Sequence, residues 1–353
     1  MISDMFMYFF YLQGTTYTME NTLASTQHAV AVNYRPECRG GTPQHLKAVS
    51  THGFLTDKDQ TPYLLDPNYP LPEYILTKTH CDEYCERCVP TLTTIHENGF
   101  VDTPFSQGCR STKRTDAADG FEGMYDEKLV HKAIHLFRSP FDNLVARMHM
   151  GTDRRPHKFS WARDRQLRDT PARMREWCEY VDEYTEKQIV RLLQLQAIPT
   201  DLYEDLPCMT EYYRWTQWHN HAVEYTQHLN VPVHIVYYED YTSHYNATVK
   251  GILDFIEAPV VHDHAPFVAG KTYEKLLFEL DVRQRAARFV QAIATPECWK
   301  LIKKGYFHEV LDTAKAEMTE QARTSPLVET LSSPGSVRQG FHNFLLRVVS
   351  GLR

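Results

Sequence analysis

The feature that most constrains the fold is a repeated order of apolar segment, polar turn and helix-like segment. Residues 5–12 are aromatic and apolar and predict a buried strand, and residues 15–30 have helical periodicity. Residues 130–137 predict a second buried strand, and a helix is expected to follow it. Because strands that alternate with helices form parallel sheets, we expect an α/β fold with a central, mostly parallel sheet flanked by helices.

The start of the helix after residue 137 carries a capping pattern. Ser139 is the expected N-cap, Pro140 the first helical residue, and Asp142 completes a pattern like a capping box. Further along, apolar periodicity predicts other elements: a strand at 74–77, helices at 171–196 and 209–229, a strand at 231–238 and a helix at 244–256.

Chain length bounds the number of domains. The 353 residues suit one large domain, which we expect to span residues 1–320. Residues 35–72 are rich in turn-forming residues and predict a loop insertion, and residues 81–114 predict an irregular loop that carries cysteines. Residues 321–353 are expected to form a C-terminal tail with a possible amphipathic helix.

Charge and hydropathy restrict the partners. The net charge of −7 argues against general nucleic-acid binding, so an anionic ligand would need a local positive site. No apolar run approaches the ~20 residues that span a bilayer, so no transmembrane segment is expected in this chain. These features leave the compartment open between the cytoplasm and the Golgi or secretory lumen.

Four of the eight cysteines lie close together, and they are Cys81, Cys85, Cys88 and Cys109. Their spacing allows a structural zinc site, a disulfide or independent thiols, because it matches no standard pair of Cys-x₂-Cys knuckles. A structural role is expected, and no catalytic metal. The remaining cysteines, Cys38, Cys178, Cys208 and Cys298, are scattered along the chain and are expected to be separate core or surface thiols.

Three groups of polar residues follow expected strands: Gly14-Thr15-Thr16, Lys78-Thr79-His80 and Arg138. In an open parallel sheet, ligands bind beyond the carboxyl ends of the strands, so the three groups are expected to meet in one crevice. The first offers backbone N–H groups at a helix N-terminus, which suits phosphate. The second offers a cation and a titratable base, and the third a guanidinium that can grip phosphate.

The ordered set of motifs resembles the P-loop-type sulfotransferases that use 3′-phosphoadenosine 5′-phosphosulfate (PAPS). The resemblance covers roughly residues 5–306 and rests on four matches, which are Gly14-Thr15-Thr16-Tyr17-Thr18, Lys78-Thr79-His80, Arg138-Ser139-Pro140-Phe141-Asp142 and Tyr238-Glu239-Asp240. Residues 77–88 are similar to a segment of sulfotransferase-like proteins of algae and other protists. The resemblance implies a P-loop NTPase-like sulfotransferase architecture, and transfer of a sulfuryl group from PAPS to a hydroxyl of a carbohydrate or small molecule.

The resemblance also implies residue roles. Gly14, Thr15 and Thr16 would hold the 5′-phosphosulfate through their backbone, Tyr17 would stack near the adenine, and Arg138 would hold the 3′-phosphate. As catalytic residues, His80 would take the proton from the acceptor hydroxyl and Lys78 would stabilise charge on the transferring group. No metal would be required, because fixed cations can stabilise the transferring group.

The chain departs from the family pattern in its phosphate loop. The family has Lys just before Ser-Gly-Thr-Thr, whereas Leu12 and Gln13 precede Gly14 here. Ala146 stands where the family has Ser, and the Gly-rich C-terminal segment is not recognisable. Two interpretations stay open: a wrongly assigned start of the chain, or a catalytically impaired binding or scaffold protein that descends from the family.

Other conspicuous residues are interpreted structurally. His131, His135, His219 and His221 are expected to be core or surface histidines, and Trp215 and Trp218 core residues. Glu239 at a strand end is expected to make structural hydrogen bonds that orient a loop. Asn246-Ala247-Thr248 is a match to the N-glycosylation motif, of a kind that arises easily by chance.

Overall fold

The chain divides into two compact units, Met1–Tyr306 and Phe307–Arg353, and every described residue except Phe307 belongs to the first. In a computed structural model, the residues described are 3–9, 15–26, 30–32, 74–79, 81, 105–106, 109, 111–113, 122–124, 127–154, 158–159, 161, 168–260, 267, 270 and 272–307. The expected tail at 321–353 and the whole of the insertion at 35–72 lie outside these residues.

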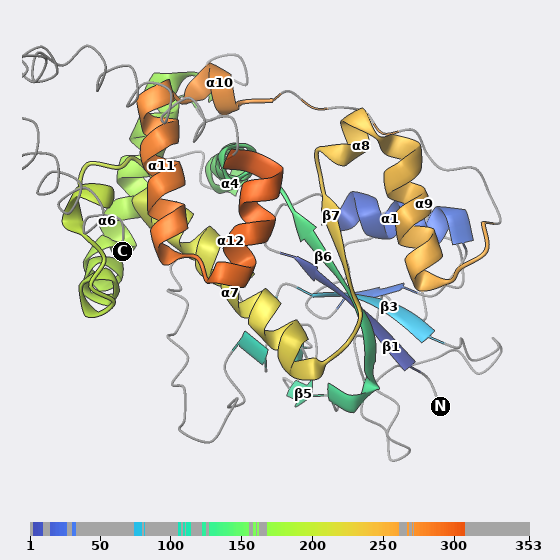
Figure 1. Cartoon of the computed structure of the whole chain (residues 1–353). Coiled ribbons are helices and arrows are strands. Elements are labelled where there is room, and N and C mark those ends of the chain that lie inside the picture. Colours follow the sequence, from blue (N-terminus) through green and yellow to red (C-terminus); the bar gives the residue numbers. More distant parts are fainter. Residues whose placement is uncertain are drawn as a thin grey trace, which may run out of the picture. The chain divides into compact units, whose positions relative to one another are not determined.

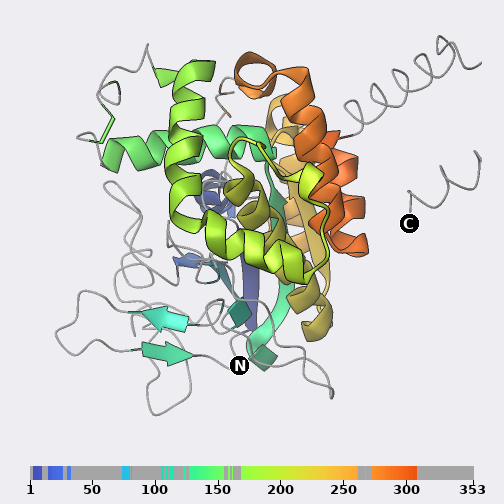
Figure 2. The ribbon, with the colours of Figure 1, turned by 90° about the vertical axis from the view of Figure 1, so that its left-hand side faces the viewer.

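Five parallel strands form the central sheet, in the order β2-β3-β1-β6-β7 (Figure 1). The strands are β1 (Ser3–Phe9), β2 (Val30–Val32), β3 (Tyr74–Thr79), β6 (Val130–Phe137) and β7 (Val233–Tyr237). An antiparallel pair, β4 (Ser111–Lys113) with β5 (Glu122–Met124), lies apart from this sheet (Figure 2). The expected parallel sheet is therefore confirmed.

Helices make up most of the described residues. The α-helices are α1 (Thr15–Thr26), α4 (Pro140–Arg154), α6 (Pro171–Leu195), α7 (Met209–Leu229), α8 (Asp240–Ser243), α9 (Tyr245–Ile256), α10 (Glu274–Leu277), α11 (Leu280–Ile293) and α12 (Pro296–Ile302). Short 3₁₀ turns η1 (Glu127–Leu129) and η2 (Thr200–Leu202) and a π-helical turn η3 (Lys303–Phe307) complete the elements.

Helices cover both faces of the sheet (Figure 1). On one face, Met19 of α1 and Ile252 of α9 pack with Leu76 of β3 and Leu136 of β6 in an apolar core. The opposite face of β6 carries the alternate residues and packs on α7. The sequence pattern predicted β6 and α7 with the bounds that the structure has, because apolar residues recur along both segments at the spacing expected of a buried strand and of a helix.

Two buried histidines join β6 to α7. His135 Nε2 lies 2.8 Å from His219 Nδ1, and both side chains are fully buried. The two rings stack on each other, and Phe137 stacks on both. Burial lowers the pKa of His135 to about 3, so the pair is neutral near pH 7. The prediction that these two are core histidines is confirmed.

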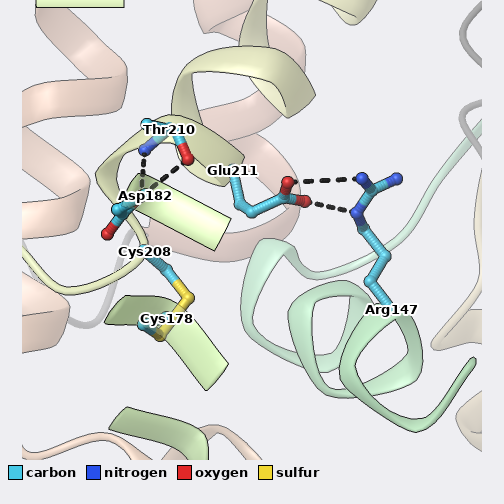
Figure 3. Close-up of a disulfide and its surroundings, with 6 residues drawn as sticks. All are labelled: Arg147, Cys178, Asp182, Cys208, Thr210 and Glu211. Atoms are coloured by element: carbon cyan, nitrogen blue, oxygen red, sulfur yellow. Dashed lines mark hydrogen bonds and ion pairs between the residues drawn. A yellow bond between two sulfur atoms is a disulfide. The ribbon is translucent and has the colours of Figure 1, made fainter. Parts of the chain in front are cut away.

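The layer of α4, α6 and α7 contains a disulfide and a buried ion cluster (Figure 3). Cys178 of α6 and Cys208, which precedes α7, form the disulfide, although their spacing in the sequence predicts separate thiols. That expectation was wrong because α6 and α7 pack together and bring residues 30 positions apart to a Cα–Cα distance of 4.4 Å. Cys298 is a free, buried thiol, as expected.

The ion cluster pairs one carboxylate with two guanidiniums. Glu211 of α7 accepts hydrogen bonds from Arg147 Nη2 at 3.3 Å and Arg214 Nη1 at 2.9 Å, and Arg147 Nε contacts its second oxygen. All three residues are at least 94% buried. Burial opposes ionisation of Glu211, but the two guanidiniums outweigh it and hold the pKa of this carboxyl below its usual value.

Candidate functional site

The strand order creates a switch point between β1 and β6. After β1 the chain passes through α1 to β2 on one side of the sheet, and after β6 it continues to β7 on the other. Neighbouring parallel strands whose connections diverge leave a crevice beyond their carboxyl ends, where ligands of open α/β sheets bind. The register places Phe9 of β1 beside Leu136 of β6, so Arg138 follows directly at this edge.

Arg138 lies against an aromatic cluster at this edge. Its guanidinium carbon is 5.0 Å from the centre of the Tyr238 ring. We define the aromatic cluster as Tyr17, Tyr238, Tyr241, Tyr245 and Phe267, which come from α1, the end of β7, α8, α9 and the segment after α9. The structure thus brings two predicted site residues, Tyr17 and Arg138, to one cluster.

Tyr17 is held on several sides within the cluster. Its ring centre is 5.0 Å from that of Phe267 and 5.2 Å from that of Tyr241, in both cases edge-on, and its hydroxyl donates to the Tyr245 hydroxyl at 3.3 Å. Burial and the neighbouring tyrosines raise the pKa of Tyr17 above its ordinary value, so the hydroxyl stays neutral. A planar base could stack at the half-buried face of such a cluster.

Glu239 ties three elements together at the same edge. One of its carboxylate oxygens accepts the Ser139 backbone N–H at 2.8 Å, and the other accepts the Tyr306 hydroxyl at 3.1 Å. The contact with Ser139 fixes the residue that follows Arg138, and the contact with Tyr306 anchors η3 beside β7. The expected structural hydrogen-bonding role of Glu239 is confirmed.

The expected capping box at α4 is not formed. The helix begins at Pro140 as predicted, but the Asp142 carboxylate accepts the Tyr273 backbone N–H at 2.7 Å instead of that of Ser139. The Ser139 backbone N–H donates instead to the carboxylate of Glu239, which is 100 positions away in sequence. The local pattern failed here because a tertiary acceptor takes the donor that a capping box uses.

Arg138 stands among carboxyl groups. Burial raises the pKa of Glu239, and Asp142 raises it further, while the Ser139 N–H and Arg138 act in the opposite direction. Burial likewise raises the pKa of Asp142, against the Tyr273 N–H and Arg138. The Arg138 guanidinium therefore interacts electrostatically with two carboxyls, Glu239 and Asp142. A phosphate that binds Arg138 would compete with these carboxyls for the guanidinium.

Lys78 is placed differently from the expectation that it follows its strand. β3 extends through Thr79, so Lys78 is the penultimate strand residue, and its side chain is 0% exposed. Lys78 of β3 lies beside Met7 of β1 in the sheet, and Met7 lies beside Ile134 of β6. Ile134 faces the core that α1 and α9 cover. Lys78 therefore lies on that face of the sheet, one step short of its carboxyl edge.

The remaining predicted residues are placed only in part. Thr15 and Thr16 are the first residues of α1, so their backbone is at a helix N-terminus as expected. Gly14, His80, Cys85 and Cys88 lie outside the described residues. Directly beyond β3, Cys81 forms a disulfide with Cys109, and its backbone N–H donates to Thr79 Oγ1 at 3.1 Å. No group of three or more potential metal ligands occurs among the described residues.

Sequence reasoning missed most of the aromatic cluster. Only Tyr17 was predicted to be part of the site. Tyr238, Tyr241 and Tyr245 are three and four positions apart, and residues at this spacing lie on the same face of a helix. Phe267 carried no such signal, because its contact with Tyr17 joins residues 250 positions apart.

Comparison with known proteins gives little support to the family resemblance. No family model matches the chain, and no curated protein matches it. Among solved structures, a sulfotransferase from Alicyclobacillus acidocaldarius aligns over 85% of this chain and 100% of its own, with a TM-score of 0.36 and 11% identity. A likeness this weak carries no argument about function. No described helix is long and apolar enough to span a bilayer.

Proposed function

We propose that this chain is a sulfotransferase that uses PAPS as sulfuryl donor and a hydroxyl of a carbohydrate or small molecule as acceptor, on a P-loop NTPase-like architecture. The observation that carries the proposal is the meeting of Arg138 and Tyr17 at the switch point of a parallel sheet. A guanidinium can hold a phosphate, and neighbouring aromatic rings can pack against a base, so the two together suit a nucleotide that carries a phosphate.

Different elements at the carboxyl edge of the sheet would bind different parts of the donor. The backbone of Gly14, Thr15 and Thr16 would receive the phosphosulfate, because the first N–H groups of α1 have no partner within the helix. Arg138 would take the 3′-phosphate, and the aromatic cluster would take the adenine. No metal is needed in this scheme, since the anion would be held by a helix N-terminus and a guanidinium.

In the reaction, His80 would accept the proton of the hydroxyl as its oxygen attacks sulfur, and the bond from sulfur to the phosphate oxygen would break. Lys78 would stabilise charge on the transferring group. Rate enhancement would come from in-line positioning and from fixed positive charge. Of these two residues, Lys78 fits a catalytic role less well, because its side chain is fully buried within a strand and its ammonium would have to reach the transferring group from there.

A transfer assay tests this proposal. Purified protein is incubated with PAPS and a panel of carbohydrate and small-molecule hydroxyls, and sulfated product is measured. His80→Ala is expected to lower transfer about a hundredfold or more. His131→Ala, which alters an exposed histidine on β6, is the matched control and is expected to retain wild-type transfer.

A second candidate is a nucleotide-binding or scaffold protein without catalysis. The buried position of Lys78 and the absence of a lysine before Gly14 favour it. Leu12→Lys combined with Gln13→Ser restores the family's loop and separates the two candidates. An enzyme limited by the missing cation should gain up to about a hundredfold in rate. Binding of nucleotide with no transfer in either form would favour the scaffold protein and exclude the enzyme.

A further inference from the structure

One short motif is left unexplained by the proposed function. Asn246-Ala247-Thr248 is the single Asn-X-Ser/Thr sequence among all 353 residues, and its central residue is not proline. Such a motif is an acceptor for N-linked oligosaccharide when the chain enters a compartment that carries out the transfer and when the asparagine is accessible. Both conditions can be examined in the structure.

The asparagine lies on an open flank of α9. The inner side of this helix is formed by buried Val249, Ile252, Leu253 and Ile256. Asn246, Lys250 and Asp254 are four positions apart along a neighbouring flank, and all three side chains are exposed. Ala247 is exposed as well. A bulky polar group on Asn246 would therefore extend into solvent without displacing the core.

The motif begins where the helix begins. Asn246 is the second residue of α9, and the Thr248 hydroxyl donates to the His244 carbonyl at 3.1 Å. In the folded helix this hydroxyl is thus engaged with the backbone. The geometry suits transfer to the chain before α9 forms, after which the exposed flank accommodates the sugar.

The second condition, the compartment, is indicated by the cysteines. The disulfide between Cys178 and Cys208 joins α6 to α7, and Cys81 and Cys109 form another in the described part of the chain. Structural disulfides persist in oxidising compartments and are rare where glutathione and thioredoxin keep thiols reduced. This observation is independent of the motif, and it points to the compartments in which N-glycosylation takes place.

We propose that Asn246 is N-glycosylated. The sugar donor is an oligosaccharide linked to a lipid through pyrophosphate. The bond from C1 of the first sugar to the pyrophosphate oxygen breaks, and a bond from C1 to Nδ2 of Asn246 forms. The amide releases one proton, and the lipid pyrophosphate leaves. This proposal does not depend on the sulfotransferase function.

Peptide mapping of the native protein from its source cells tests the proposal. The peptide that contains Asn246 is expected to carry an oligosaccharide, which peptide-N-glycosidase removes while converting Asn246 to aspartate. The same maps, made without reduction, are expected to show Cys178 joined to Cys208. An unmodified Asn246 peptide, or Cys178 and Cys208 as free thiols in the native protein, would overturn the proposal.

Variants expressed through a secretory pathway sharpen the test. Asn246→Gln and Thr248→Ala should abolish the glycosidase-sensitive shift in electrophoretic mobility, whereas Thr248→Ser keeps the hydroxyl and should retain it. The non-reduced map of each variant verifies that the chain has folded with its disulfide. A shift that survives in both Asn246→Gln and Thr248→Ala would show that the sugar is attached elsewhere, and the proposal would be wrong.

Discussion

Glu211 is buried and Glu239 is half-buried, and their surroundings shift their pKa values in opposite directions. Glu211 lies between two guanidiniums, Arg147 and Arg214, and its pKa is lowered. Glu239 shares one nearby guanidinium, Arg138, with a second carboxyl, and its pKa is raised. Burial acts in the same direction on both groups, so the number of nearby cations decides the outcome.

The difference separates a structural region from the candidate site. In the layer of α4, α6 and α7, the charge of Glu211 is compensated by two guanidiniums and a disulfide crosslinks the chain, while a neutral histidine pair joins α7 to β6. At the carboxyl edge, Arg138 is shared among carboxyls and an aromatic ring, so its interactions can be exchanged for those of a ligand. We therefore expect substitutions in the first region to affect stability, and substitutions in the second to affect binding.

The largest effect on stability is expected from Glu211→Gln. Removal of this charge leaves two buried guanidiniums uncompensated, which should lower the free energy of unfolding by about 3–5 kcal/mol. Denaturant unfolding measures this loss. Glu183→Gln, on the exposed side of α6, is the matched control and should be neutral. Equal stability of the two variants would refute the idea that the Glu211 cluster supports the fold.

A slightly smaller loss is expected when the disulfide is removed. Cys178→Ser with Cys208→Ser frees a crosslink between residues 30 positions apart, which should lower stability by about 3–4 kcal/mol through the entropy of the unfolded chain. Cys298→Ala removes a buried sulfur that forms no disulfide and should cost only about 1 kcal/mol. If both changes cost the same, the bridge contributes nothing beyond packing.

The histidine pair formed by His135 and His219 should make the free energy of unfolding sensitive to acid. The folded pKa of His135 is about 3 and its ordinary value is 6.5, so the unfolded chain binds more protons between these pH values. Its contribution to stability is complete above pH 6.5 and is lost as pH falls toward about 3. His135→Leu with His219→Leu should flatten the decline in unfolding free energy with pH, and an unchanged slope would exclude this role.

Glu239→Gln should have the smallest effect on stability, about 1 kcal/mol or less, because Gln can still accept the Ser139 N–H. The raised pKa means that the folded state binds more protons, so the contribution of Glu239 is largest at low pH and decreases as pH rises above its ordinary pKa of 4.5. Unfolding curves at several pH values measure the loss of stability and its dependence on pH. A loss as large as that of Glu211→Gln would remove the contrast between the two regions.

Some of this organisation could be predicted from sequence, and some could not. β6 and α7 followed from local apolar patterns. Lys78 was predicted to follow its strand, but pairing of β3 with β1 continues through Thr79 and places Lys78 inside it. The partner of Ser139 and the pairing of Cys178 with Cys208 depend on contacts between residues far apart in sequence, and local rules carry no information about these.

The same limit applies to the candidate site. Arg138 was predicted from its place after an apolar strand, and Tyr17 only through the resemblance of its motif to that of the P-loop-type sulfotransferases. That the two share an aromatic cluster follows from the strand order, which sets β1 beside β6. The carboxyls that surround Arg138 come from α4 and from the end of β7, and their influence on its availability emerged only from the folded arrangement.

The central claim is that the carboxyl edge between β1 and β6 binds a nucleotide through Arg138. Calorimetric titration with 3′-phosphoadenosine 5′-phosphate tests it most directly, with Arg175→Ala, an exposed arginine of α6, as the matched control. We predict binding by the wild type and the control, and a loss of about 1.5–3 kcal/mol, roughly tenfold to a hundredfold in affinity, for Arg138→Ala. No binding by the wild type, or equal binding by Arg138→Ala, would contradict the claim.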